Sequence, residues 1–180
     1  MKQQTNIKGD EKMKIESIKI KHMSDESPDL SWLGEYTDEL YNGVIVRRYD
    51  EFYENLDEDM EIPERGREFR FFKPCAGDEK HGTKEYYKYG MQDYKRAEDY
   101  NNGYFSLIGI QAEAVVSYPS GNGSRRLEWL TSAGLWGIES DSGDYLDEVT
   151  KDELEDLKRH LEHFGVNTDN FYQIDIEYPV

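Results

Sequence analysis

The chain has 180 residues and a formal net charge of −17 at pH 7, with 39 Asp and Glu against 22 Lys and Arg. A field of that sign repels nucleic acid and anionic membranes and attracts basic protein surfaces, including those that normally hold DNA or RNA. The single cysteine, Cys75, excludes an intramolecular disulfide and a cysteine-based zinc site, and fits a reducing cytoplasm.

The expected organisation is one folded domain. Length favours a single domain, and 14 Tyr and 3 Trp supply buried area for its core. Residues 1–12 are polar and lack the apolar segment of a signal peptide, so we expect a disordered tail there. No apolar run approaches the ~20 residues of a membrane-spanning helix. The prediction is therefore a tail over 1–12 and a single α+β domain over 13–180.

Periodic patterns place strands and helices in chain order. Strands are expected over 13–22, 36–40, 44–49, 67–73, 104–118, 125–130, 135–138 and 171–178, and helices over 50–60, 84–101 and 151–164. The first strand changes phase at Ser17, and its lysines favour a sheet edge. Asn42 and Gly43 favour a type I′ turn, which predicts that the second and third strands form a hairpin.

The strand over 104–118 is the expected centre of the fold. Its period of two is interrupted at Gly109, which predicts a bulge or the close approach of a neighbouring backbone. Residues 119–123 form a turn, after which the next two strands return antiparallel to it. The predicted fold class is α+β, an antiparallel sheet around a long central hairpin with two or three helices packed on it.

The second and third helices carry capping signals. Thr83 is the expected N-cap of the second helix, in which Gly90 should cost ~1 kcal/mol relative to alanine. Thr150 and Glu153 form a capping box that should open the third helix, and Gly165 should end it. The expected inner faces are Tyr86, Tyr87, Met91, Tyr94, Ala97 and Tyr100 on the second helix and Leu154, Leu157, Leu161 and Phe164 on the third.

No pattern in the sequence predicts catalysis. His160 and His163 lie near Asp156, but a zinc site usually needs three or four convergent ligands, so a solvated helix face is the favoured interpretation. The acidic loop 139–148 offers oxygen ligands without the spacing of a calcium loop. Motifs of serine or cysteine nucleophiles are missing. We therefore expect no enzyme, no catalytic residues, no metal and no cofactor.

The negative charge is concentrated in two stretches. Residues 24–61 carry −11 and residues 139–156 carry −8, while the rest of the chain sums to about +2. Duplex DNA carries one charge per ~1.7 Å of its axis, so rows of carboxylates on a rigid scaffold could imitate it. Charges of this kind raise association rates, and neighbouring aromatic side chains supply buried anchors. The alternative is an acidic surface that serves solubility alone.

The candidate partner-binding residues are taken from these stretches. The acids are Asp50, Glu51, Glu54, Asp57, Glu58, Asp59, Glu61, Glu139, Asp141, Asp144, Asp147 and Glu148. The aromatic anchors are Trp32, Tyr36, Tyr53 and Tyr145.

Four segments carry a recognisable combination of residues. They are 28–36 (PDLSWLGEY), 89–94 (YGMQDY), 112–114 (AEA) and 132–142 (SAGLWGIESDS). With them, most of the chain after Met13 resembles a group of small proteins encoded on phages, plasmids and other mobile elements. The resemblance carries no catalytic residue. It implies a mobile-element origin, where small acidic proteins are often inhibitors of host defence, such as anti-restriction and anti-CRISPR proteins.

Charge and resemblance together predict a non-enzymatic inhibitor of a host defence nuclease in the cytoplasm of a bacterial host cell. The expected partner is a basic nucleic-acid-binding protein. A Cas9-type nuclease or its ribonucleoprotein is the specific expectation, because its guide and target lie in positively charged channels. Direct binding to nucleic acid or membrane is not expected. The alternatives are a metal-dependent enzyme that uses the loop 139–148 and a structural or assembly protein of a mobile element.

Overall fold

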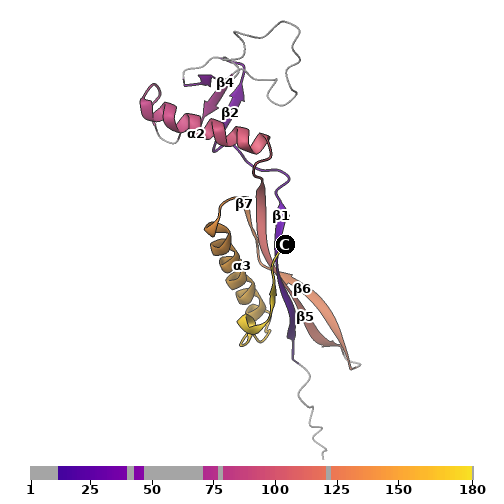
Figure 1. Ribbon diagram of the computed structural model, residues 1–180. Coiled ribbons are helices and arrows are strands. Elements are labelled where there is room, and N and C mark those ends of the chain that lie inside the picture. Colours follow the sequence, from indigo (N-terminus) through magenta and orange to yellow (C-terminus); the bar gives the residue numbers. More distant parts are fainter. Residues whose placement is uncertain (1–11, 40–42, 47–70, 77–78, 121–122, 180) are drawn as a thin grey trace, which may run out of the picture. The chain divides into compact units, whose positions relative to one another are not determined.

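The computed structural model of the chain describes residues 12–39, 43–46, 71–76, 79–120 and 123–179 (Figure 1). These residues belong to two compact units. Unit 1 consists of the described residues within Met1–Glu26 and Ser106–Val180, and unit 2 consists of those within Ser27–Phe105. Unit 2 is therefore an insertion in the chain between two parts of unit 1. The sequence predicted one core, whereas the described residues bury two separate hydrophobic clusters.

Unit 1 is built on a five-stranded sheet in the order β6-β5-β1-β8, with β7 also paired to β5. The strands are β1 (Lys14–Ser24), β5 (Leu107–Ser120), β6 (Ser124–Thr131), β7 (Leu135–Glu139) and β8 (Ile176–Glu177). β6 and β7 both return antiparallel along β5, which confirms the long central hairpin and the α+β class. β1 is not the edge strand that its lysines predicted, because β8 pairs with it in parallel at Ile18 and Lys19.

Both irregularities that the sequence predicted in this sheet are present. The register of β1 against β5 shifts between Ile15 and Ser17, where the apolar alternation changes phase. The register of β5 against β7 shifts around Gly109. A Cβ added to Gly109 would lie 2.5 Å from Cε3 of Trp136, so the indole of Trp136 lies directly against this glycine. The close approach, and not only the bulge, therefore requires glycine.

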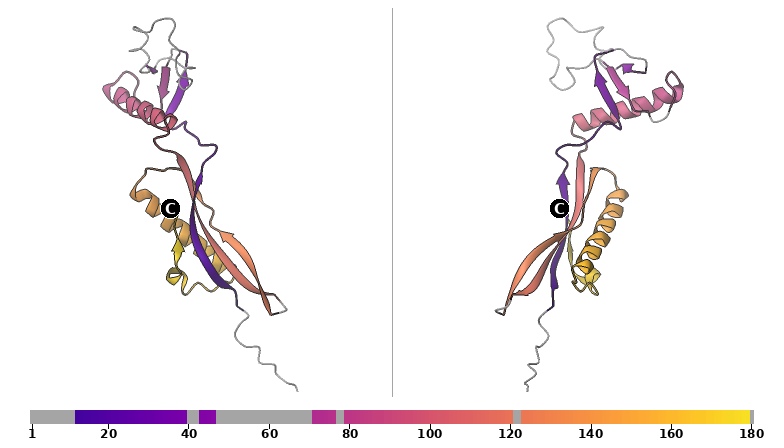
Figure 2. Two further views of the ribbon diagram at one scale, coloured as in Figure 1. Left: turned by 45° about the vertical axis from the view of Figure 1, so that its right-hand side comes forward. Right: turned by 180° about the vertical axis from the view of Figure 1, so that it is seen from behind.

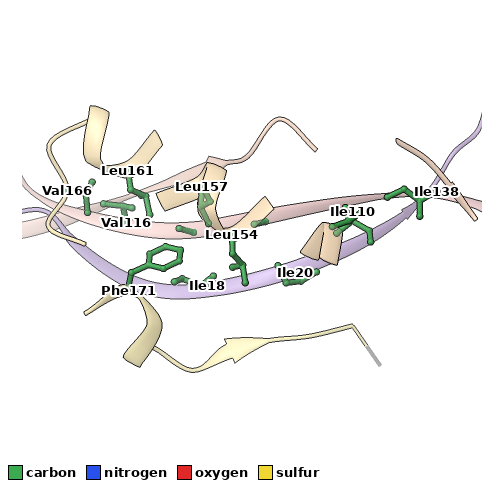
Figure 3. Close-up of a cluster of buried hydrophobic side chains, with 13 residues drawn as sticks. Ile18, Ile20, Ile110, Val116, Ile138, Leu154, Leu157, Leu161, Val166 and Phe171 are labelled. Carbon is green, nitrogen blue, oxygen red and sulfur yellow. The ribbon is translucent and has the colours of Figure 1, made fainter. Parts of the chain in front are cut away.

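The helix α3 (Asp144–His163) covers one face of this sheet (Figures 1 and 2). Leu154, Leu157 and Leu161 of α3 point toward β1 and β5 (Figure 3). The buried cluster consists of Ile18, Ile20, Ile110, Ala112, Ala114, Val116, Ile138, Val149, Leu154, Leu157, Leu161, Val166 and Phe171. Phe171 begins a short 3₁₀ helix, η1 (Phe171–Gln173), so the predicted strand over 171–178 is reduced to β8.

α3 begins earlier than the capping box predicted. Its N-cap is Gly143, at φ 57°, and the acids in its first turn supply the negative charge that a helix N-terminus favours. Thr150 and Glu153 are buried inside the helix instead of capping it. Glu153 Oε2 accepts a hydrogen bond from Gly134 N at 2.9 Å. Thr150 and Glu153 therefore lie on the buried side of α3, where Glu153 contacts the connection between β6 and β7.

The end of α3 follows the prediction at Gly165 and departs from it at Phe164. Gly165 has φ 77°, in the left-handed region that favours glycine, and its N–H donates to Glu162 O at 2.9 Å. Phe164 was expected on the inner face, but 57% of it is exposed. Because the last helical residue is His163, Phe164 no longer continues the buried stripe of leucines.

Unit 2 contains a three-stranded antiparallel sheet covered by the helix α2 (Lys84–Asn101). Its strands are β2 (Gly34–Thr37), β3 (Ile45–Val46) and β4 (Phe71–Pro74), and its buried cluster is Leu33, Ile45, Phe72, Tyr94 and Ala97. The predicted hairpin of the segments flanking Asn42 and Gly43 does not form, because β4 lies between β2 and β3. The predicted helix over 50–60 lies outside the described residues.

α2 confirms its predicted cap and part of its predicted inner face. Thr83 Oγ1 accepts a hydrogen bond from Tyr86 N at 3.2 Å. Tyr86, Tyr94 and Ala97 are buried, whereas Tyr87 and Met91 are 54% and 48% exposed. Gly90 is buried, and a Cβ added to it would lie 2.8 Å from Cγ of Pro74. This glycine is therefore a contact point of α2 with β4.

Replacing Gly90 with alanine should lower the stability of unit 2, although the same change stabilises an ordinary helix interior. The helix propensity of alanine contributes about 1 kcal/mol, but overpacking of a close contact costs about 1–3 kcal/mol. Urea unfolding followed by circular dichroism measures the net effect. Gln92→Ala, at an exposed position of α2, is the control and should change little. A more stable Gly90→Ala protein would contradict the close packing of α2 on β4.

A buried ion cluster lies on the face of the unit 1 sheet opposite α3. Glu113 of β5 is 6% exposed and lies directly across from Lys19 of β1. Lys19 Nζ is 2.9 Å from Glu113 Oε1, and Lys21 Nζ donates a hydrogen bond to Glu113 Oε2. Burial acts to raise the pKa of Glu113, but the hydrogen bonds and charges of the two lysines outweigh it and hold that pKa below its usual value.

Ionised Glu113 should contribute stability that is lost in acid. Because its folded-state pKa is lowered, the contribution is present above the unfolded-state pKa and disappears as the pH falls through the folded-state value. Glu113→Gln should lower the free energy of unfolding at pH 7, and the advantage of the wild type should shrink as the pH falls through the folded-state pKa of Glu113. Chemical denaturation from pH 7 into the acid range tests this prediction. Glu26→Gln, at an exposed position just after β1, should keep the wild-type profile, and a Glu113→Gln profile identical to that of the wild type would sink the assignment.

Candidate protein-interaction surface

The outward side of α3 carries a row of exposed carboxylates. We call Asp144, Asp147, Glu148 and Asp152 the acidic face of α3; all four side chains are exposed. The buried side chains of α3, from Val149 to Leu161, occupy the opposite side of the same helix. Residues four apart lie one above the other on a helix, so Asp144, Glu148 and Asp152 form a single line.

The carboxylates of the acidic face are not neutralised by neighbours. Among the described residues, no hydrogen bond and no ion pair holds any of the four side chains. Lys151 is the one cation in the sequence between residues 144 and 155. It lies beside the row without an ion pair to it in the described part of the chain.

The charge density of this segment matches one nucleic-acid strand. With Glu155, residues 144–155 expose five acids against Lys151 over a helix length of about 16 Å. This corresponds to about one net negative charge per 4 Å, close to the 3.4 Å per phosphate of a single strand and well below the charge density of a duplex. The spacing of net charge along residues 144–155 is therefore closer to that of one nucleic-acid strand than to that of a duplex.

Other acids of α3 hold the helix in place. Besides the bond of Glu153 to Gly134, Asp156 Oδ2 accepts a hydrogen bond from Ala133 N at 3.3 Å, and Asp156 Oδ1 accepts one from Arg159 at 2.9 Å. His160 Nδ1 lies 3.2 Å from Thr131 O. The contacts of Glu153, Asp156 and His160 hold α3 against the end of β6 and the connection between β6 and β7, on the side of the helix away from Asp144 and Glu148.

The loop before α3 is a closed turn. Ser140 Oγ accepts a hydrogen bond from Ser106 N at 3.0 Å, and Ser140 N donates to Ser106 O at 2.8 Å. Ser142 Oγ donates to Glu139 O at 2.7 Å. Glu139 is half-buried and Asp141 is exposed. Ser140 and Ser142 therefore bind backbone groups. The loop ends at Gly143, directly before the acidic face begins at Asp144.

One predicted aromatic anchor lies with the acids. Tyr145 is 48% exposed and stands one turn before Glu148 on the same helix. Trp32 and Tyr36 belong to unit 2. Tyr36 is half-buried: its hydroxyl donates to Glu98 Oε1 at 2.7 Å and accepts from Asn101 Nδ2 at 3.1 Å. Burial and then the Glu98 carboxylate raise the pKa of Tyr36 far above its usual value, so this tyrosine ties β2 to α2 as a neutral phenol.

The remaining predicted residues lie outside the described part of the chain. They are Asp50, Glu51, Tyr53, Glu54, Asp57, Glu58, Asp59 and Glu61. Sequence reasoning also missed Asp152, because the capping box assigned it to the first turn of a helix that in fact begins at Asp144. The four-residue spacing of Asp144, Glu148 and Asp152 is the signal that identifies it.

The histidine pair does not converge with acids on a metal-binding geometry. His160 Nε2 lies 3.8 Å from Asp156 Oδ2, while the ring of His163 lies against that of Phe164, with centroids 5.9 Å apart. Within the ranges that the structure describes, no three His, Cys, Asp or Glu side chains are arranged to hold a metal ion.

No family model matches the chain, and no curated protein and no solved structure matches it either. Neither of the helices in the described ranges has the combination of length and apolar character that crossing a bilayer requires.

Proposed function

We propose that this chain is a non-enzymatic binding protein whose acidic face on α3 occupies a basic, nucleic-acid-binding surface of another protein. The observation that carries the proposal is the line of Asp144, Glu148 and Asp152, exposed, without partners among the described residues, and mounted on a helix whose other side is fixed in the core.

The line of carboxylates formed by Asp144, Glu148 and Asp152 does not stabilise the fold. Like charges four residues apart on a helix destabilise it by a few tenths of a kcal/mol per pair, and the line contains two such pairs. The helix dipole offsets this cost only within the first turn, which contains Asp144 and Asp147 but not Asp152. Solubility requires net charge, but it does not require a line of carboxylates on one helix.

The acidic face would act in two steps. Its charge accelerates encounter with a basic surface, and the exposed ring of Tyr145 then provides an anchor that can be buried. Because charge pairing at an accessible surface is screened, the complex should weaken as the salt concentration rises. The partner's own nucleic acid competes for the same surface, so binding is inhibitory without any chemical step.

The proposed partner class is a host defence nuclease in the bacterial cytoplasm. The basis for this narrower statement is the resemblance to mobile-element proteins together with the charge of the acidic face. A Cas9-type ribonucleoprotein is the specific candidate, because it holds its guide and target in positively charged channels. Such an effector also holds the displaced non-target strand of the DNA, and this single strand is the ligand whose charge spacing the acidic face approaches.

A cleavage assay tests the candidate target. A Cas9-type ribonucleoprotein is incubated with a molar excess of the protein before target DNA is added, and the cleaved fraction is followed in time. The expected result is a loss of cleavage with the wild type and restored cleavage with a variant in which Asp144, Asp147, Glu148 and Asp152 are replaced by their amides. Undiminished cleavage with the wild type would exclude this target.

A further inference from the structure

The outer edge of β6 is open within unit 1. β6 is the last strand in the order β6-β5-β1-β8, and both views of Figure 2 show no strand of unit 1 on the side of β6 that faces away from β5. Its pairing with β5 is regular from Ser124 to Thr131, and its sequence contains no proline. Proline, bulges and inward-pointing charges are the usual means of blocking an edge, so β6 is competent to pair with another strand.

Two large apolar side chains of β6 are exposed to solvent. Leu127 and Trp129 are 51% and 59% exposed. They pair with Ser117 and Val115 of β5, which places them on the face of the sheet opposite α3. A partner strand at this edge would cover both side chains, because neighbouring strands bring their side chains to within about 5 Å of one another.

The sequence of β6 is complementary to itself. In an antiparallel pair, two residues that lie directly opposite each other point to the same face of the sheet. When the two strands are identical, the twofold axis of the pair must therefore pass beside one residue of each strand, and it cannot pass between two consecutive residues. A pair centred on Arg126 or on Glu128 would place like charges opposite each other. A pair centred on Leu127 places Arg126 of each strand opposite Glu128 of the other, twice. Opposite charges that lie directly across from each other stabilise such strand pairs.

The charges needed for this pairing are accessible. Arg126 is exposed and has no ion-pair partner among the described residues. Glu128 is exposed and accepts a hydrogen bond from the Tyr118 hydroxyl at 3.1 Å, which leaves its other oxygen open to a guanidinium. β6 is also locally basic, with two arginines and one glutamate, in a chain of net charge −17. Two copies therefore repel each other less along this edge than across the acidic face.

We propose that two copies of this chain associate through β6, in an antiparallel pair centred on Leu127 that makes the two unit 1 sheets continuous. Its twofold symmetry uses the same edge on both copies, so assembly stops at a dimer. This proposal does not depend on the function proposed for α3. One strand pair is small beside the about 1,200–2,000 Å² of a stable interface, so a micromolar dissociation constant is expected.

Charge exchange across the pair provides the test. Sedimentation equilibrium over about 1 µM to 1 mM should show a monomer–dimer equilibrium for the wild type. Arg126→Glu and Glu128→Arg should each weaken self-association at least tenfold, because each places like charges opposite one another twice. An equimolar mixture of the two variants should form heterodimers, because the altered patterns complement each other. Recovery by mixing also shows that both variants are folded.

Lys84→Glu in α2 is the matched control, since it makes the same charge change as Arg126→Glu at an exposed position that belongs to unit 2 and not to β6. It should dimerise like the wild type. A wild type that stays monomeric up to about 1 mM would overturn the proposal. So would single variants that dimerise as well as the wild type, or a mixture that fails to recover the dimer.

Discussion

Replacing Phe171 with alanine should lower the free energy of unfolding of unit 1 by about 4 kcal/mol. Phe171 is 1% exposed and belongs to the same buried cluster as Ile18 and the leucines of α3 (Figure 3). Removing its ring leaves a cavity at the point where the C-terminal segment closes the core, and both the lost burial and the cavity lower stability. Urea unfolding at several temperatures, monitored by circular dichroism, measures the loss.

The neighbouring residue provides the control. Tyr172 follows Phe171 in the same 3₁₀ helix but is 54% exposed, with its hydroxyl bonded to Glu155. Tyr172→Ala should cost about 1 kcal/mol or less. Equal losses for the two variants would show that η1 does not close the core of unit 1.

Replacing the acidic face by amides should weaken binding to a basic partner about 100-fold at low salt. The variant Asp144→Asn, Asp147→Asn, Glu148→Gln and Asp152→Asn keeps the shape of these side chains and removes four charges. Exposed charge pairs contribute up to about 1 kcal/mol each, so the loss of all four is expected to cost roughly 3 kcal/mol, which corresponds to about 100-fold in affinity. Stability should stay close to that of the wild type or rise slightly, because the like-charge pairs are removed.

Four exposed acids elsewhere make a control of identical charge. They are Glu26, Glu35, Glu39 and Glu79, each replaced by Gln. If net charge alone drives binding, both fourfold variants lose affinity equally, and the acidic face has no special role. If the acidic face is the site, only the α3 variant loses affinity, and its remaining binding depends less on salt. Surface plasmon resonance at several salt concentrations separates these outcomes.

Local signals in the sequence led to correct predictions where the structure depends on a local cause. The phase change at Ser17 predicts the register shift of β1, because side chains alternate regardless of what pairs with the strand. Thr83 caps α2 because its neighbours in the chain supply the hydrogen bond. Both features need only a few consecutive residues. Gly109 marks the predicted bulge, but the close neighbour is the indole of Trp136 and not the backbone that was expected.

Predictions that depend on distant segments were wrong. Asn42 and Gly43 favour a hairpin, but β4 lies between the two expected strands, and no turn signal reveals a strand that arrives later in the chain. Thr150 and Glu153 have the spacing of a capping box, yet the same spacing places both on the buried side of α3, where Glu153 binds Gly134. Gly143 starts the helix through its backbone conformation, which leaves no side-chain signal.

The candidate surface was predictable in part. The sequence identified the acids from Glu139 to Glu148 and Tyr145, because charge density needs no fold to be recognised. It could not divide the acids of α3 into those exposed in a line and those that hold the β6–β7 connection. That division depends on which side of α3 packs against the sheet. The packing side follows from the tertiary structure, in which α3 already begins at Asp144.

Competitive elution separates occupation of a nucleic-acid site from other modes of binding. Wild type and the fourfold amide variant of the acidic face are immobilised, exposed to bacterial lysate at low salt, and eluted first with a short DNA duplex or single strand and then with salt. We expect that wild type captures nucleic-acid-binding proteins, that the oligonucleotide releases them, and that the amide variant captures none of them. Capture of the same proteins by both, or retention in the presence of excess oligonucleotide, would contradict the claim that the acidic face of α3 occupies a nucleic-acid site.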